Sequence, residues 1–162
     1  MSDEIKTIKR EQVFFDDIEV GSEIPSLVKG PYKVMTMAKF AALMGDFYPA
    51  HYDSKWAVEK DRIPAAIAHG LQVTAYLSQL LTDWVGPNGV LRRFASQVRA
   101  QTFLGDTLTM KGRVTKKYTK DGENYLECEV WGEKQDGTVV VEGSATVTLP
   151  SRELAIHQPE IL

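Results

Sequence analysis

The sequence has almost no cysteine and no strong excess of charge. Cys128 is the only cysteine among 162 residues, so no disulfide can form within the chain. A net charge of −3 provides no overall basic field that would attract nucleic acid. No apolar run approaches the ~20 residues that a membrane-spanning helix needs. These absences exclude a disulfide scaffold and argue against a protein that binds nucleic acid or spans a membrane.

The chain also lacks a recognisable targeting segment. Its first residues, Met1–Lys6, have neither the basic start nor the apolar stretch of a signal peptide, so we expect a cytoplasmic protein. Apolar residues make up 43% and charged residues 25%, which is typical of a globular chain. With no repeat or linker, we predict a flexible N-terminal segment at 1–13, one domain at 14–149 and a C-terminal tail at 150–162.

Local composition predicts a strand and then a short helix in the first third of the chain. Residues 27–36 are rich in β-formers and predict a strand. Residues 36–45 begin with a capping residue, contain good helix formers and end at a glycine, which predicts a helix. Phe40, Leu43 and Met44 fall at helical spacing, so we expect them to pack inward.

The rest of the chain predicts a buried helix followed only by strands. Residues 45–68 resist regular structure, and a long loop inside a compact domain is often functional. Residues 69–84 are apolar on most sides, which predicts a buried helix. Asp-Gly turn signals separate the later β-rich runs, which are 90–103, 106–118, 125–134 and 139–149. The fold class is therefore α+β, with an antiparallel sheet wrapped around a long central helix.

Two residues of the irregular segment could act as an acid–base pair. Asp46 and His51 are five residues apart, a spacing that would point them in different directions on a continuous helix. Because a glycine and Pro49 break the helix, a tight loop could fold both side chains around one point. A carboxylate and an imidazole that share one water can perform general acid–base catalysis. We expect Phe47 and Tyr48 to bury this pair.

Two other interpretations of the segment stay open. Asp46 could close a local turn by a hydrogen bond to the backbone, with His51 as an ordinary loop histidine. Asp46, His51 and Asp53 could instead bind a metal, although zinc sites prefer nitrogen and sulfur ligands. We do not favour the metal-binding interpretation.

The residues that open the long helix are a second candidate site. Backbone N–H groups in the first turn of a helix have no partner and lie at the positive end of its dipole. His69 and Gly70 stand there, and a glycine lets a substrate carbonyl approach closely, so the Gly70 N–H could stabilise an oxyanion. The simpler alternative is that Gly70 permits a turn and that His69 packs or caps the helix.

Arginine side chains provide candidate contacts for an anionic carrier. Their planar guanidinium groups suit phosphate oxygens, although most surface arginines are simply solvated. The candidates are Arg62, Arg92, Arg93 and Arg99.

Three short motifs together resemble those of the MaoC-like (R)-specific enoyl-CoA hydratases and dehydratases. Residues 45–53, Gly-Asp-Phe-Tyr-Pro-Ala-His-Tyr-Asp, resemble the hydratase-2 motif of this family. Residues 67–71, Ile-Ala-His-Gly-Leu, are similar to a second signature that opens the central helix. Residues 104–108, Leu-Gly-Asp-Thr-Leu, resemble a third signature between strands. The likeness covers about residues 14–149 and keeps the family's order.

This resemblance implies a hot-dog fold and a thioester substrate carried by CoA or a carrier protein. It implies that Asp46 and His51 activate the water added to a trans-2-enoyl thioester, with the Gly70 N–H as oxyanion donor. Dehydration of an (R)-3-hydroxyacyl thioester is equally compatible, and no cofactor is required. Tyr48 and His69 are then expected to contact the substrate. Such proteins are usually homodimers or higher homo-oligomers, and a heteromer of two hot-dog subunits is a further option.

The chain departs from the family pattern around the site. Tyr48 stands where asparagine is usual, and Ala50 replaces a larger aliphatic residue, which puts the substrate in doubt more than the reaction. Residues 82–87 are similar to a segment of bacterial hydratases that act on steroid side-chain CoA thioesters, so a bulky substrate is one option. Two alternatives to a hydratase are an acyl-CoA thioesterase, suggested by the fold alone, and a non-catalytic subunit that binds acyl chains.

Overall fold

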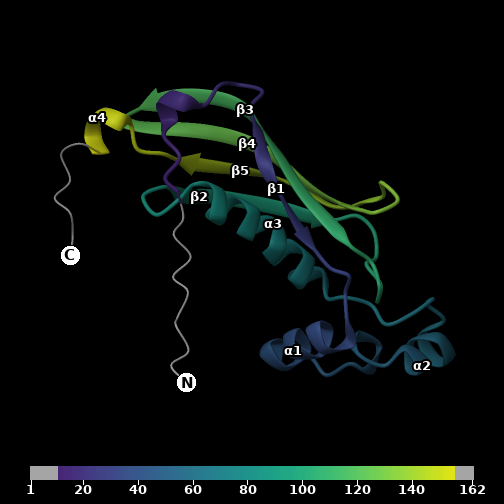
Figure 1. Ribbon diagram of the computed structural model, residues 1–162. Coiled ribbons are helices and arrows are strands. Elements are labelled where there is room, and N and C mark those ends of the chain that lie inside the picture. The colour runs from purple at the N-terminus through teal and green to yellow at the C-terminus, as the bar shows by residue number, and fades with distance from the viewer. Residues whose placement is uncertain (1–10, 156–162) are drawn as a thin grey trace, which may run out of the picture.

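Five antiparallel strands curve around the long helix α3 (Figure 1). This computed structural model describes residues 11–155. The strands follow the order β1-β3-β4-β5-β2, so β1 and β2 form the edges of the sheet. No helix in residues 11–155 combines the length and apolar character needed to cross a membrane. The elements are η1 (Phe15–Asp17), β1 (Glu23–Lys29), α1 (Val34–Met44), η2 (Pro49–His51), α2 (Ser54–Trp56), η3 (Ala57–Asp61), α3 (Gly70–Trp84), β2 (Val90–Val98), β3 (Leu108–Lys120), β4 (Glu123–Lys134), β5 (Val139–Thr148) and α4 (Arg152–Ala155).

Helix α3 lies at the centre of the core. Its Leu77 and Leu81 are fully buried. Leu126, Cys128 and Val130 are buried at alternate positions of β4, and successive side chains of a strand point to opposite faces, so these three face the helix. Burial raises the pKa of the Cys128 thiol to about 12, which fits a packing role. The predicted layout of a sheet around a central helix is confirmed.

Helix α1 packs differently from its prediction. It lies with α2 beyond the N-terminal end of α3 (Figure 1) and ends at Gly45, which adopts the left-handed conformation with φ of 67°. Met37 and Ala41 are its buried residues, whereas Leu43 is 79% exposed and Met44 is also exposed. The inward packing predicted for Leu43 and Met44 is therefore wrong, because α1 covers the end of α3 along only a narrow stripe.

The first strand is shorter and earlier than predicted. β1 ends at Lys29, and the chain turns at Gly30, which has φ of 132°. A side chain at Gly30 would lie 2.8 Å from the carbonyl oxygen of Asp106, so glycine is needed for this close approach. Pro31 has no N–H for a strand ladder, and the β-branched residues that follow belong to α1 instead.

The segment before α3 is held by a short strand-like contact. β2 ends at Val98 instead of at Phe103, and Phe103 pairs with Ile67 in an isolated antiparallel bridge. The Ala68 N–H donates a 2.8 Å hydrogen bond to the Thr102 carbonyl beside this bridge. The backbone at the entrance to α3 is therefore fixed by residues more than thirty positions away.

The start of the predicted tail packs against the beginning of the domain. The Phe15 N–H donates to the Pro150 carbonyl at 3.0 Å, and the Arg152 guanidinium contacts the Asp17 carboxylate at 2.6 Å. The rest of the tail, with His157, lies outside the described residues, as does most of the predicted N-terminal segment.

Candidate active site

Asp46 directly follows Gly45, the C-cap residue of α1, and the turn there directs its carboxylate. Gly45 ends the helix, and the Asp46 N–H donates to the Ala41 carbonyl at 3.1 Å. Asp46 Oδ1 accepts a 3.2 Å hydrogen bond from the Tyr48 N–H, so the turn-closing interpretation is correct for one carboxylate oxygen. Oδ2 lies 3.7 Å from His51 Nε2, so the predicted pair does come together.

His51 is held in one orientation by the segment before α3. It ends η2, and its Nδ1 lies 2.8 Å from the Ile67 carbonyl oxygen. The Ile67 N–H in turn donates to the Ala50 carbonyl at 2.9 Å. A carbonyl oxygen can only accept, so Nδ1 carries a hydrogen and Nε2 is the atom that gains or loses a proton. That atom faces Asp46.

His69 is a third member of this cluster. Its Nε2 lies 3.2 Å from Asp46 Oδ2, closer than that of His51. The rings of His51 and His69 stack with their centroids 3.5 Å apart. The half-buried Phe40 ring of α1 also contacts His69, with the two ring centroids 5.4 Å apart. The sequence suggested that His69 contacts substrate or packs the helix. It did not predict the stack, because seventeen residues, which include α2 and η3, separate His69 from His51.

The surroundings favour a neutral His69. Its side chain is 7% exposed, and burial, together with a smaller effect of His51, lowers its pKa despite the opposite effect of Asp46. Two stacked imidazoles repel each other when both are charged, so the stack itself disfavours a second positive charge on His69. The Asp46 side chain is 51% exposed, and Phe47 and Tyr48 are exposed, so the burial predicted for the pair by these two residues is wrong.

Gly70 begins α3 directly beside this cluster. Its N–H belongs to the first turn and so has no partner within the helix. No backbone carbonyl of the described residues accepts from it either. Gly70 lines a pocket of about 250 Å³ together with Ile67 and Val98. A ligand carbonyl in this pocket would meet an unpaired donor at the positive end of a helix.

Tyr48 stands at the edge of the cluster. Its ring lies edge-on to the His51 ring, with centroids 6.3 Å apart, and its hydroxyl donates to Asp61 at 2.6 Å. The Tyr48 hydroxyl is therefore already hydrogen-bonded to η3, and the exposed ring is the part that a substrate can contact.

The four candidate arginines do not gather at one place. Arg92 contacts Glu123 and Thr148 near the start of β2, about 20 Å along the strand from Val98, and the exposed Arg93 follows it. Arg62, at the end of η3, is exposed and takes a left-handed φ of 57°. The structure brings neither Arg92 nor Arg93 to the cluster.

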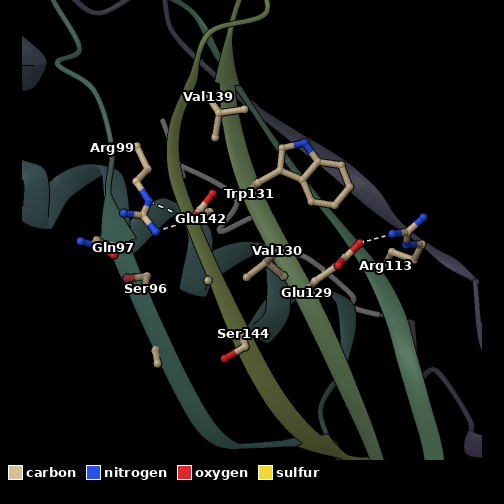
Figure 2. Close-up of a pocket in the computed structure, with 12 residues that line it drawn as sticks. Ser96, Gln97, Arg99, Arg113, Glu129, Val130, Trp131, Val139, Glu142 and Ser144 are labelled. Atoms are coloured by element: carbon tan, nitrogen blue, oxygen red, sulfur yellow. Dashed lines mark hydrogen bonds and ion pairs between the residues drawn. The ribbon is translucent and has the colours of Figure 1, made fainter.

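Arg99 is the candidate that borders the Gly70 pocket. Its guanidinium, however, pairs with Glu142, and the Nε to Oε1 distance is 2.8 Å. This ion pair forms one side of an open groove of about 870 Å³ on the sheet, with Trp131 at its centre and the Arg113–Glu129 pair across it (Figure 2). Arg99 therefore lines the Gly70 pocket while its guanidinium is paired with Glu142.

The cluster has the residue types of a metal site but not the geometry. Ligand atoms of Asp46, His51 and His69 lie within 4.8 Å of one another, and two histidines with one carboxylate can bind iron. An ion bound by two imidazoles must lie near both ring planes, whereas these rings are stacked at an angle of only 21°. Asp53, the other predicted ligand, instead caps α2 by accepting from the Lys55 and Trp56 N–H groups. The residues therefore fit proton transfer better than metal binding.

Comparison with known proteins agrees with this fold. Residues 10–132 match the family model described as the MaoC like domain, and the chain belongs to this family. It is 31% identical over 145 residues to the (R)-specific enoyl-CoA hydratase of Rhodospirillum rubrum, covering 86% of this chain and 93% of that one. The fold is the hot-dog fold of these proteins.

Two solved structures illustrate the likeness. The (R)-hydratase from A. caviae involved in PHA biosynthesis is 27% identical, with a TM-score of 0.72 over 83% of this chain and 98% of the other. A chain of the ChsH1–ChsH2 complex from Mycobacterium tuberculosis is 23% identical, with a TM-score of 0.68 over 81% of this chain and 98% of that chain.

Proposed function

We propose that this protein catalyses the reversible addition of water to a trans-2-enoyl-CoA, which gives an (R)-3-hydroxyacyl-CoA. The observation that carries the proposal is the meeting of Asp46 and His51 Nε2 beside the unpaired Gly70 N–H. The hydratase of R. rubrum, to which the chain is similar over most of its length, supports the same reaction class. No cofactor is needed, because the thioester itself makes C3 electrophilic.

In the proposed reaction, Asp46 and the neutral His51 hold one water over C3 of the substrate. The water oxygen bonds to C3 while His51 Nε2 takes one of its protons, and the electron pair of the double bond moves toward the thioester oxygen. The Gly70 N–H stabilises the charge that develops on this oxygen. The proton then passes from the cluster to C2, which completes the addition of one water and restores the neutral His51.

His69 holds the carboxylate in this scheme. It contacts the same Asp46 oxygen that faces His51, and its buried ring cannot turn toward solvent. A proton on His69 would repel one on the stacked His51, so a neutral His69 keeps His51 able to accept a proton. His69 is thus a positioning residue for the pair.

The direct test is hydration of crotonyl-CoA and of longer or bulkier enoyl-CoAs by the purified protein. We expect loss of the enoyl absorbance and an (R)-3-hydroxyacyl product in chiral analysis. Release of free CoA without water addition would replace the proposal by thioester hydrolysis. Failure with every enoyl-CoA, alone and with a partner, would leave a non-catalytic acyl-binding subunit as the better account.

The preferred chain length and bulk are a separate part of the proposal. The segment similar to that of steroid hydratases includes Trp84 and Val85, which are buried in the core at the far end of α3 from Gly70. This segment therefore packs in the core, and its similarity does not bear on the size of the acyl group. We propose the exposed Tyr48 ring as the residue that shapes the entrance, and Tyr48→Asn should change the ranking of substrates by size.

We further propose that a second hot-dog subunit, identical or related, covers this face of the molecule. The argument is that the elements near the site and the end of the edge strand β2 carry exposed apolar side chains, namely Leu43, Phe47, Trp56, Leu71 and Val98. Large exposed apolar patches mark protein interfaces. Light scattering of the purified chain should give at least twice the monomer mass. A monomer that becomes active only with a related subunit would favour the heteromer.

A further inference from the structure

A small pocket lies where β1 passes into α1, and no residue of the catalytic cluster lines it. Lys29, Tyr32, Lys33, Thr36 and Tyr76 line it, and its volume is about 320 Å³. This volume is at the lower end of the range for ligand pockets and exceeds what one inorganic anion fills. Its walls combine two ammonium groups, three hydroxyl-bearing residues and the apolar surfaces of two tyrosine rings.

The two charged residues that line this pocket, Lys29 and Lys33, are both positive. The half-buried Lys29 places its Nζ 5.0 Å from the centre of the Tyr76 ring. Lys33 is the N-cap residue of α1, where a cation is unfavourable because the helix dipole is already positive. The first turn of α1 holds no acidic residue, and the ion pairs of residues 11–155 include neither lysine. A bound anion would pair with the two lysines and would interact favourably with the positive end of the helix dipole.

The start of α1 adds unpaired donors to these cations. It has no side-chain cap, although the residue types preferred at an N-cap would provide one. The Thr36 and Met37 N–H groups both turn back to the Lys33 carbonyl, which leaves those of Val34 and Met35 without a backbone acceptor in the described residues. The pocket thus lies at the amino end of an eleven-residue helix, since Lys33 and Thr36 line it.

A second, independent observation points to a ligand. Tyr32 is among the lining residues, it is only 2% exposed, and its buried hydroxyl has no hydrogen-bond partner among the described residues. Burial raises the pKa of Tyr32, with smaller contributions from Tyr76 and Asp106, so the hydroxyl keeps its hydrogen near neutral pH. The Asp106 carboxylate is itself paired with Lys134. A buried donor that stays unpaired costs stability, and a bound acceptor oxygen would remove this cost.

We propose that this pocket binds a phosphate group, with Lys29, Lys33 and the amino end of α1 as the charged contacts and Tyr32 as a buried donor. Phosphate suits it better than a carboxylate, because a double charge and several acceptor oxygens match two cations and several donors. Gly70 and Tyr76 are about 9 Å apart along the axis of α3. If the proposed hydratase function holds, the phosphates of the CoA carrier are one source of this group, and a free phosphate compound is the other.

The first test measures binding without any reaction, so it is independent of the hydratase proposal. Inorganic phosphate is titrated into the full-length protein and followed by amide chemical shifts and by the rise in melting temperature. We expect shifts around residues 29–36, and Lys33→Ala should raise the phosphate Kd by about tenfold or more. Lys39→Ala, which removes the same charge from an exposed position of the same helix, should leave the Kd unchanged. Equal Kd values for the two variants would overturn the proposal.

Tyr32→Phe gives a second test that does not depend on charge. Since the hydroxyl has no partner in the described residues, its removal should leave the stability of the ligand-free protein unchanged or raise it. The same change should reduce the rise in melting temperature that phosphate produces. If Tyr32→Phe destabilises the ligand-free protein and leaves phosphate binding intact, the hydroxyl already has a partner and the inference fails.

The source of the phosphate is decided by comparing carriers. If CoA supplies it, Lys33→Ala should raise the KM for crotonyl-CoA and leave kcat and the KM for crotonyl-pantetheine, which has no phosphate, unchanged. If the ligand is a separate phosphate compound, phosphate binding is still lost in Lys33→Ala while both KM values stay the same. An enzyme that is inactive but binds phosphate here would sink the hydratase proposal and keep the phosphate site.

Discussion

Gly70 gives the sharpest prediction, because nothing in the surrounding chain requires glycine there. Each of the other eleven glycines either has a positive φ or would place a Cβ less than 3.0 Å from a neighbouring atom. Gly70 has an ordinary φ, and its nearest contact would be the Val98 Cγ2 at 3.3 Å. A helix favours alanine over glycine, so the fold offers no reason for this residue. We attribute it to the close approach of a substrate carbonyl.

Gly70→Ala should therefore separate stability from activity. The gain in helix propensity is about 0.5–1 kcal/mol, and the small movement required of the flexible Val98 side chain offsets part of it. The free energy of unfolding should stay within about 1 kcal/mol of the wild-type value. The new methyl group projects toward Val98, into the pocket of about 250 Å³, and should displace the thioester enough to lower kcat/KM by about 10²-fold.

The assay is chemical denaturation alongside hydration kinetics with crotonyl-CoA. Gly143→Ala provides the contrast, since its Cβ would meet the Ala95 carbonyl oxygen at 2.3 Å and should destabilise the sheet. A folded Gly70→Ala variant with wild-type kcat/KM would show that no carbonyl approaches this amide, and the oxyanion role would be refuted.

Three further predictions concern buried ionisable groups. Burial acts to raise the pKa of Asp106, but the Phe103 N–H, Gln135 and Lys134 outweigh it and lower the pKa. Asp106→Asn should thus cost about 2 kcal/mol at neutral pH, and this difference should shrink as the pH falls below 3.8 in urea titrations. His69, with its lowered pKa, binds a proton more readily when unfolded, so wild-type stability should decrease as the pH falls below 6.5, and His69→Gln should show less of this decrease in the same titrations. The Cys128 thiol, buried and with its pKa raised to about 12, should react with a thiol reagent only after unfolding, as mass spectrometry would show.

The sequence was informative where local chemistry decides the structure. Gly45 and Pro49 break the helix on either side of Asp46, and this alone predicted that the carboxylate and His51 could meet. The long apolar run predicted α3 almost to the residue, because a helix buried on most sides has a period that needs no knowledge of its neighbours.

Contacts between segments far apart in the chain could not be predicted from the sequence. The stack of His51 on His69 depends on the bridge between Ile67 and Phe103, which joins segments that share no local pattern. The exposure of Leu43 depends on what lies opposite α1, and periodicity does not specify that. Arg99 was a candidate for carrier phosphates by residue type, but Glu142 on the neighbouring strand pairs with it.

The central claim is that Asp46 takes part in adding water to an enoyl thioester, and a single comparison tests it most directly. Asp46→Asn keeps an oxygen that can accept from the Tyr48 N–H, so the turn should survive. Asp121→Asn is the matched control, since Asp121 has a φ of 52° that asparagine also adopts readily. We predict that kcat for crotonyl-CoA hydration falls by about 10³-fold in Asp46→Asn and stays unchanged in Asp121→Asn. Equal, wild-type-like kcat values in two folded variants would contradict the account.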